Sequence, residues 1–197
     1  MRLTILALTS VLAAGGCSPG GIGSLGGYGR AHAIDVVLPA KAPPIASDYG
    51  DRYRVDGECC RAQPNDGIDI VTARGHAVIA PADGTVADAG EDFALGKHLA
   101  LVHTLPNGSA ITTRYLHLDS IDVTARQKVY RGQRIGSVGR TGSGSAGVYH
   151  LHFSVSLGNP HYYWIGGPGS VECFDPGKLY QPAGDALFTY PVACTRR

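Results

Sequence analysis

Two histidines stand at alternate positions in the stretch YHLHFSV, as His150 and His152. In an extended strand, alternate side chains point to the same face about 7 Å apart, so these imidazoles can converge on one metal ion and its bound water. The simpler alternative is a pair of polar residues on a solvated strand face. The apolar neighbours Leu151 and Phe153, which point to the other face, weaken that alternative. The pattern therefore indicates a functional site.

Asp69 and His117 offer further groups of the same kind. Asp69 follows the turn pair DG at the start of a strand, and its carboxylate is a good oxygen ligand for zinc. An acid in such a position is, by itself, usually a turn or cap residue. His117 alternates with Leu116 and Leu118 in RYLHLDS, so we expect it to face away from both. A lone strand histidine is more often structural than catalytic, so these two residues count only in combination.

Turn signals and short apolar runs divide residues 45–155 into strands. Asp83-Gly84 and Asn107-Gly108 each lie between two apolar runs, which predicts a hairpin at each pair. Gly132 opens another short strand in YRGQRIGSVG, and HLHFSVS is a further one. Glycine is abundant, at 28 residues, and charge-patterned helices are hard to find. We expect a mainly β domain of antiparallel strands, with long loops and little helix.

Taken in order, these stretches resemble the lysostaphin/LytM-type zinc endopeptidases, which cleave peptidoglycan peptides. The resemblance covers about residues 45–155 and is carried by the stretches IASDYGDR, GIDI, GHAVIAPADGTVADAG, RYLHL, VYRGQRIGSVGRTG and YHLHFSV. It implies a compact antiparallel β-sheet domain with an open groove, in agreement with the strands inferred above.

The resemblance also implies roles for individual residues. The family motif His-x-x-x-Asp falls on Asn65 and Asp69, and its His-x-His falls on His150 and His152. The implied Zn²⁺ ligands are Asn65, Asp69 and His152. His117 and His150 would stand beside the zinc-bound water, where one takes its proton and the other supports the developing oxyanion.

Asn65 is the one departure from this motif. Its amide oxygen is a neutral ligand better suited to hard cations, and it falls short of the far ring nitrogen of a histidine. We therefore expect a substantial loss of zinc affinity, with zinc weakly bound or absent. Gln63, His98 or His103 could complete the ligand set, although a histidine at the position of His103 is also common in the family.

The N-terminus predicts export. Arg2 precedes an apolar run, residues 3–14, that is too short for a mature membrane span and is typical of a secretory signal. Small residues lead directly to Cys17, which resembles a bacterial lipoprotein signal with Cys17 as the lipidated residue. Ordinary secretion without lipidation is the alternative. We expect an exported bacterial lipoprotein of the cell envelope, facing the periplasm or the outer surface.

The remaining cysteines fit an oxidising compartment. Four are left: Cys59, Cys60, Cys173 and Cys194. Because adjacent cysteines rarely bond each other, we expect two disulfides that join the first pair to the second, with the partners unassigned. A thiolate metal site near the proposed ligands is the alternative.

The chain of 197 residues divides into four parts. These are a signal peptide ending at Cys17 (1–17), a flexible Gly/Pro-rich linker and approach segment (18–44), the LytM-like domain (45–158) and a disulfide-pinned tail packed on it (159–197). The net charge of +1 offers no basic surface for nucleic acid.

Two functions remain open. The one favoured by the sequence is a metalloendopeptidase that hydrolyses peptide cross-links of peptidoglycan through a metal-bound water. The alternative is a catalytically degenerate member that binds peptidoglycan or activates a partner cell-wall hydrolase. A carrier domain of the biotinyl type is set aside, because no modifiable lysine stands at the expected turn. The expected partners are thus peptidoglycan peptides, the membrane through a lipid anchor, and a second hydrolase.

Overall fold

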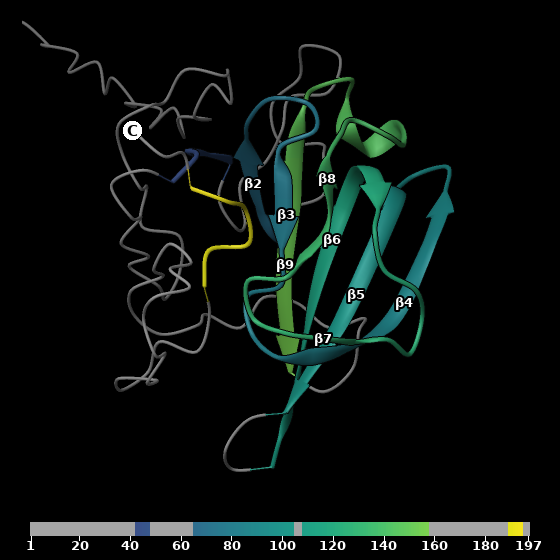
Figure 1. The fold of residues 1–197 in the computed structure, drawn as a ribbon. Coiled ribbons are helices and arrows are strands. Elements are labelled where there is room, and N and C mark those ends of the chain that lie inside the picture. Colours follow the sequence, from purple (N-terminus) through teal and green to yellow (C-terminus); the bar gives the residue numbers. More distant parts are fainter. Residues whose placement is uncertain (1–41, 48–64, 105–107, 158–188, 195–197) are drawn as a thin grey trace, which may run out of the picture.

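The computed structural model in Figure 1 describes four stretches of the chain: residues 42–47, 65–104, 108–157 and 189–194. Seven residues singled out above lie outside them: Arg2, Cys17, Cys59, Cys60, Gln63, Asn107 and Cys173. Lipidation, the cysteine pairing and the four-part division of the chain therefore stay predictions. Within the described stretches, no helix is long and apolar enough to cross a membrane.

The described residues form a single antiparallel β-sheet with almost no helix. Its strands are β1 (Ile45–Ser47), β2 (Ile68–Val71), β3 (Ala77–Ile79), β4 (Gly84–Asp92), β5 (Gly96–Thr104), β6 (Ala110–Ile121), β7 (Lys128–Val129), β8 (Arg134–Val138) and β9 (His150–Leu157), and a short 3-10 helix, η1, covers Ser143–Ser145. The strand order is β1-β2-β9-β6-β5-β4-β7, while β8 pairs with both β6 and β3. The prediction of an antiparallel β domain with little helix is confirmed, and the open groove stays a prediction.

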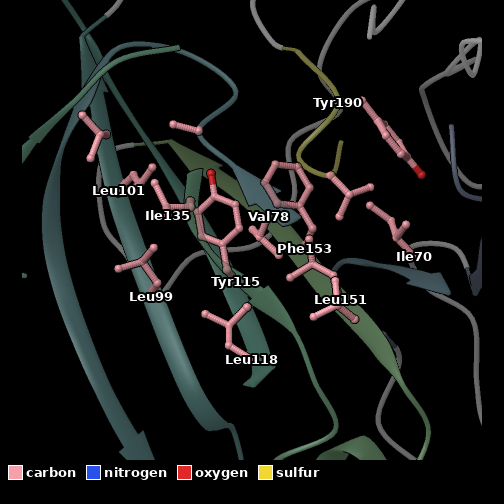
Figure 2. Packing of buried hydrophobic residues seen from close by; sticks show 14 of the residues in the cluster. Ile70, Val78, Leu99, Leu101, Tyr115, Leu118, Ile135, Leu151, Phe153 and Tyr190 are labelled. Carbon is pink, nitrogen blue, oxygen red and sulfur yellow. The ribbon is translucent and has the colours of Figure 1, made fainter. Parts of the chain in front are cut away.

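The two faces of the sheet follow from the alternation of side chains along its strands. On β9, Leu151, Phe153 and Val155 point to one side and are buried in the hydrophobic cluster. We call this side the core face, and the opposite side, to which His150 and His152 point, the site face. Figure 2 shows how strands distant in sequence contribute the core residues. The largest fully buried ones are Tyr115, Tyr190, Ile70, Leu99, Leu101, Leu118, Ile135 and Leu151.

One of the two predicted hairpins is wrong. β5 and β6 do form a hairpin across Asn107-Gly108, with Thr104 opposite Ala110. β3 and β4, however, do not pair across Asp83-Gly84, because β3 pairs with β8, and β4 with β5 and β7. Gly84 instead allows close packing: a Cβ there would lie 2.7 Å from the His103 ring and from the Val102 carbonyl. Asp83-Gly84 therefore connects two strands that pair with other strands and not with each other.

Residues 189–194 lie along the outer edge of β3. The backbone N–H of Ile79 donates to Pro191 O at 2.8 Å, and that of Ala193 donates to Ala77 O at 3.0 Å. The hydroxyl of Tyr190 donates to Pro43 O at 2.7 Å, so this segment also holds the chain just before β1 (Figure 1). Cys194 is disulfide-bonded, with a partner outside the described residues.

Candidate active site

The pairing of β2 with β9 brings together the acid and the histidines that the sequence singled out. Asp69 lies opposite His152, and Val71 lies opposite His150. The two strands approach closely because Gly67 precedes β2: a Cβ there would lie only 2.5 Å from Phe153 O and 2.8 Å from His152 Nε2. The glycine of the turn is thus needed for the contact between the two halves of the site.

His117 reaches the same place through an irregularity in β6. Its backbone has φ of +66°, in the left-handed region, and the pairing register shifts at this point. Leu116 lies opposite His152 on the site face, whereas Leu118 is buried in the core. His117 is the extra residue between them, so the simple alternation expected from the sequence is only half right. Such a conformation costs about 1–2 kcal/mol for a residue other than glycine, and it is of the kind that clusters at functional sites.

The three imidazoles form one buried cluster on the site face. The ring centroids of His117 and His150 are 4.9 Å apart, and those of His117 and His152 are 6.2 Å apart. His117 Nδ1 lies 2.9 Å from Thr141 O, and His150 Nδ1 lies 3.0 Å from Val148 O. A carbonyl only accepts, so in both rings Nδ1 carries the proton and, while the ring is neutral, Nε2 keeps a lone pair. Two basic nitrogens are therefore fixed in place beside Asp69.

Burial and neighbouring charge keep His117 neutral. Burial is the larger cause and the nearby His150 the second, and together they lower the pKa of His117 to about 4. The hydrogen bond to Thr141 O acts in the opposite direction but does not outweigh them. At neutral pH this ring is a base rather than an acid.

His152 lies between two carboxylates. Its Nδ1 is 3.0 Å from Asp69 Oδ1, and its Nε2 is 3.1 Å from Asp66 Oδ1, although that oxygen is not in line for a hydrogen bond with the ring N–H. Burial by itself would lower the pKa of His152, but the contacts with Asp66 and Asp69 outweigh it and raise the pKa to about 9. His152 in turn lowers the pKa of Asp66. A protonated His152, held by Asp66 and Asp69, is thus favoured at neutral pH.

Asp66 is a site residue that the sequence motifs do not indicate, because its place in the turn pair DG already accounts for it. The available signal was its position, one residue after Asn65 and beside the glycine that lets β2 approach β9. Its side chain is half-exposed, whereas His152 is buried. Asp66 thus forms the solvent-facing side of the carboxylate–imidazole–carboxylate arrangement.

Asn65 is buried, and both ends of its amide are engaged within the protein. Its Nδ2 donates to Ser47 Oγ at 3.1 Å, and its Oδ1 accepts from the backbone N–H of Gly67 at 3.3 Å. Ser47 lies opposite Asp69 in the β1–β2 pairing, so these bonds join the turn to the edge strand. The amide oxygen of Asn65, which would have to replace the histidine nitrogen of the family motif, thus already accepts a hydrogen bond from the turn.

These residues do not fit a catalytic zinc site. Asp69 Oδ1 and His152 Nδ1, 3.0 Å apart, could share one ion at the usual zinc distances of about 2.0–2.2 Å. Catalytic zinc sites usually have three protein ligands, and the resemblance to the family motif would assign the third to Asn65. Within the described residues, no three His, Cys, Asp or Glu side chains are grouped to hold a metal. His98 and His103, which could have completed the ligand set, have other partners. His98 pairs with Asp88, and His103 contacts Asp83 O and Thr113.

Comparison with known proteins places this arrangement in a family. The sequence pattern of peptidase family M23 matches residues 63–162, about half of the chain. The chain belongs to peptidase family M23. The match includes every residue of the site except Ser47, and the M23 assignment confirms the resemblance drawn from the sequence motifs.

The relatives that this chain matches carry two kinds of name. Peptidoglycan DD-endopeptidase ShyB of Vibrio cholerae is 38% identical over 99 residues, which cover 50% of this chain and 22% of that protein. Murein hydrolase activator NlpD of Escherichia coli is also 38% identical, over 91 residues that cover 46% of this chain and 22% of that protein. This chain spans only about a fifth of the length of its curated relatives.

A solved structure agrees with the M23 fold. A zinc-containing peptidase from Vibrio cholerae superposes with a TM-score of 0.50 and 33% sequence identity, over 62% of this chain and 36% of that one. M23 membership makes zinc the metal to test. Because the ligand set described above does not fit a catalytic zinc site, membership of M23 does not by itself assign zinc to this chain.

Proposed function

We propose that this M23 domain binds peptidoglycan peptides without hydrolysing them and acts through a partner hydrolase. The observation that carries the proposal is the state of Asn65. Its Nδ2 donates to Ser47 and its Oδ1 accepts from the Gly67 N–H, so the residue at the first ligand position of the family motif offers a neutral amide oxygen that already accepts a hydrogen bond. The similarity to NlpD, whose name describes an activator of murein hydrolases, supports the same function.

The rest of the site is suited to binding. His117 and His150 each present an Nε2 lone pair that can accept from a peptide N–H, since their Nδ1 protons are held by carbonyl groups. Asp66 and Asp69 add carboxylate oxygens beside them. An extended peptide could thus be held by fixed polar groups, with no need for a metal.

The second candidate is a zinc endopeptidase, and one observation favours it. Asp69, His117, His150 and His152 all lie in one cluster, with Asp69 and His152 oriented toward a shared point between them. ShyB, which is named as a peptidoglycan endopeptidase, supports this reading. The two candidates differ in one measurable property, the binding of zinc.

Metal content and cleavage together decide between them. The wild type, Asn65→His and the control Asn65→Leu are loaded with zinc, dialysed and analysed for metal, then incubated with purified peptidoglycan. We expect the wild type and the leucine variant to bind peptidoglycan in a sedimentation assay, to retain little zinc and to release no new amino groups. The histidine variant should retain more zinc, since it restores a nitrogen ligand. Equimolar zinc in the wild type, together with new amino groups, would contradict the proposal.

We also propose that the protein is exported and anchored in the cell envelope through Cys17. The cell-wall proteins among its relatives and the signal-like N-terminus support this location. Mass spectrometry of the membrane fraction should find a lipid on Cys17, and Cys17→Ser should move the protein to the soluble fraction. Recovery of the unmodified wild type in the soluble fraction would contradict anchoring.

A further inference from the structure

The site face continues from the histidine cluster to Arg114 on β6, the strand between β9 and β5 (Figure 1). Leu116 of β6 lies opposite His152 of β9. Two residues earlier on β6, Arg114 lies opposite Ser154. Because residues two apart on a strand share a face, Arg114 and Ser154 point to the same side of the sheet as His152. Arg114 is thus a diagonal neighbour of His152 on the adjacent strand, roughly 7–8 Å away, which a long side chain can reach across.

Arg114 also acts on the site through its charge. The pKa of Asp66 is lowered mainly by its contact with His152, and Arg114 adds a smaller electrostatic effect in the same direction. Such effects weaken with distance. The effect on Asp66 therefore agrees with the place beside His152 that the strand register gives to Arg114.

The guanidinium of Arg114 has no direct partner within the stretches that the structure describes. Its side chain is half-buried there, yet it makes neither an ion pair nor a hydrogen bond with them. Asp66 is in contact with His152 instead, at 3.1 Å. By contrast, the more exposed Arg74 and Arg134 pair with carboxylates at 3.0 and 2.8 Å. Because a partly buried charge is stabilised by a partner, the N–H donors of Arg114 are suited to a ligand.

Ser154 adds a second donor at the same place. Side chains directly opposite each other in an antiparallel pair have Cβ atoms about 4.5–5.5 Å apart, so the Ser154 hydroxyl lies beside Arg114. Ser154 is 8% exposed, and its hydroxyl makes no hydrogen bond with the described residues. A hydroxyl can donate one hydrogen bond to an anion. The two opposed residues thus offer a charged donor and a neutral donor next to the histidine cluster.

We propose that Arg114 and Ser154 bind a carboxylate of the peptide held at the histidine cluster. The inference rests on the proposed peptide-binding function and adds the chemical class that the site selects, a peptide with a free carboxylate. A guanidinium presents a planar set of N–H donors that matches a carboxylate in a two-point contact. The strand pairing fixes both residues on one face, so the carboxylate subsite lies at a set distance from His152.

The test compares two synthetic cell-wall stem peptides, one with free carboxylates and one fully amidated, by calorimetric titration of the full chain without added metal. The wild type should bind the free form about tenfold more tightly, the size expected for a hydrogen bond to a charged group. Arg114→Gln should lower the affinity for the free form to that for the amidated form. Arg114→Lys should keep part of the preference, because it keeps the charge but loses the two-point contact. Ser154→Ala should reduce the preference by a smaller factor.

Arg126→Gln is the matched control. Arg126 is exposed, has no ion pair among the described residues and lies just before β7, at the opposite end of the sheet order from β1 and β2. It should leave the preference at the wild-type value. Melting temperatures check that each variant folds, and the lysine and alanine variants decide the test if Arg114→Gln does not fold.

Two results would overturn the inference alone: equal affinity of the wild type for both peptides, or a wild-type preference in the folded variants of Arg114 and Ser154. Failure of the wild type to bind either peptide would overturn the proposed function as well.

Discussion

Opposite faces of one sheet carry two sets of buried histidines with different surroundings. His103 on β5 points to the core face, in the alternation that also buries Leu99 and Leu101. His150 and His152 on β9 point to the site face. All three are at most 7% exposed, so burial does not distinguish them. What distinguishes them is the group that faces each ring nitrogen.

His103 is part of a chain of neutral hydrogen bonds. Its Nδ1 donates to Asp83 O at 2.8 Å, so in the neutral ring Nε2 accepts from the hydroxyl of Thr113, also at 2.8 Å. Thr113 Oγ1 lies 2.9 Å from the hydroxyl of Tyr115, which completes the chain. Both nitrogens of His103 are occupied, and burial lowers its pKa, so the ring stays neutral and structural.

On the site face, His152 lies between Asp66 and Asp69, while His117 and His150 donate their Nδ1 protons to carbonyls and each keep an Nε2 lone pair. In a buried region such an arrangement is useful for binding or catalysis, and it contributes little to folding because its charges must be balanced at a cost. The comparison teaches that the role of a histidine in this fold is decided by its second ring nitrogen. Four substitutions or conditions can break or sharpen that contrast.

The largest effect is expected for His103→Ala. This change removes two buried hydrogen bonds and leaves the Asp83 carbonyl without its partner, so the free energy of unfolding should fall by about 2–3 kcal/mol. His150→Ala, the matched change on the site face, should lower it by less than about 1 kcal/mol. Urea denaturation followed by circular dichroism measures both. A loss at His150 as large as that at His103 would remove the distinction between the two faces.

Gly67→Ala tests whether the site face is as tightly packed as the core. The added methyl group would meet the Phe153 carbonyl and the His152 ring, so we expect a loss of about 2 kcal/mol, typical of overpacking. Gly90→Ala is the control, because its methyl group would meet only the end of the His98 side chain, at 3.2 Å. Similar melting temperatures for the two variants would show that β2 can move away from β9 without cost.

The pH dependence of stability should reveal the neutral state of His103. Because burial lowers its pKa, the unfolded chain binds a proton more readily than the folded one once the pH falls below about 6.5. Stability is thus fully present above that pH and is lost as the pH decreases, by at most about 1.4 kcal/mol per pH unit for this group. The decline between pH 7.5 and 5.5 should be less steep in His103→Gln than in the wild type. Equal slopes of stability against pH in the two proteins would contradict a neutral His103.

The smallest effect is expected for Ser47→Ala. Asn65 Nδ2 loses one buried hydrogen bond, and the free energy of unfolding should decrease by about 1 kcal/mol. The metal content should not change, because the substitution adds no ligand. Ser47→Thr keeps a hydroxyl and serves as the control. Zinc uptake by Ser47→Ala would mean that the hydrogen bond to Ser47, rather than the chemistry of the amide, keeps metal out.

Most of the fold could be predicted from the sequence because its signals are local. Alternation in HLHFSV assigns the two faces of β9, and Asn107-Gly108 indicates the β5–β6 hairpin. Asp69, His117, His150 and His152 were expected at one site, and the structure brings them together. Each of these conclusions depends on residues that are close in sequence or on a known order of motifs.

The remainder depends on contacts between distant segments. Asp83-Gly84 has hairpin chemistry, yet Gly84 is needed to pass His103, a residue 19 positions later in the chain. The backbone N–H of the irregular residue His117 donates to Leu95 O, and Asn65 donates to Ser47 on β1. No local sequence pattern encodes such partners. The local motifs therefore predict which residues form the site, but not the hydrogen bonds that hold Asn65 and His117.

The hydrogen bond from Tyr190 to Pro43 also dictates an order of events during biosynthesis. The two residues are 147 positions apart, and β1, which carries Ser47, begins two residues after Pro43. On a ribosome, residue 43 emerges long before residue 190. Until then the segment before β1 lacks the hydrogen bond that Tyr190 supplies, so the edge of the site that contains Ser47 and Asn65 gains this restraint only late in synthesis. A nascent chain halted before residue 190 would carry the histidine cluster but lack this outer restraint.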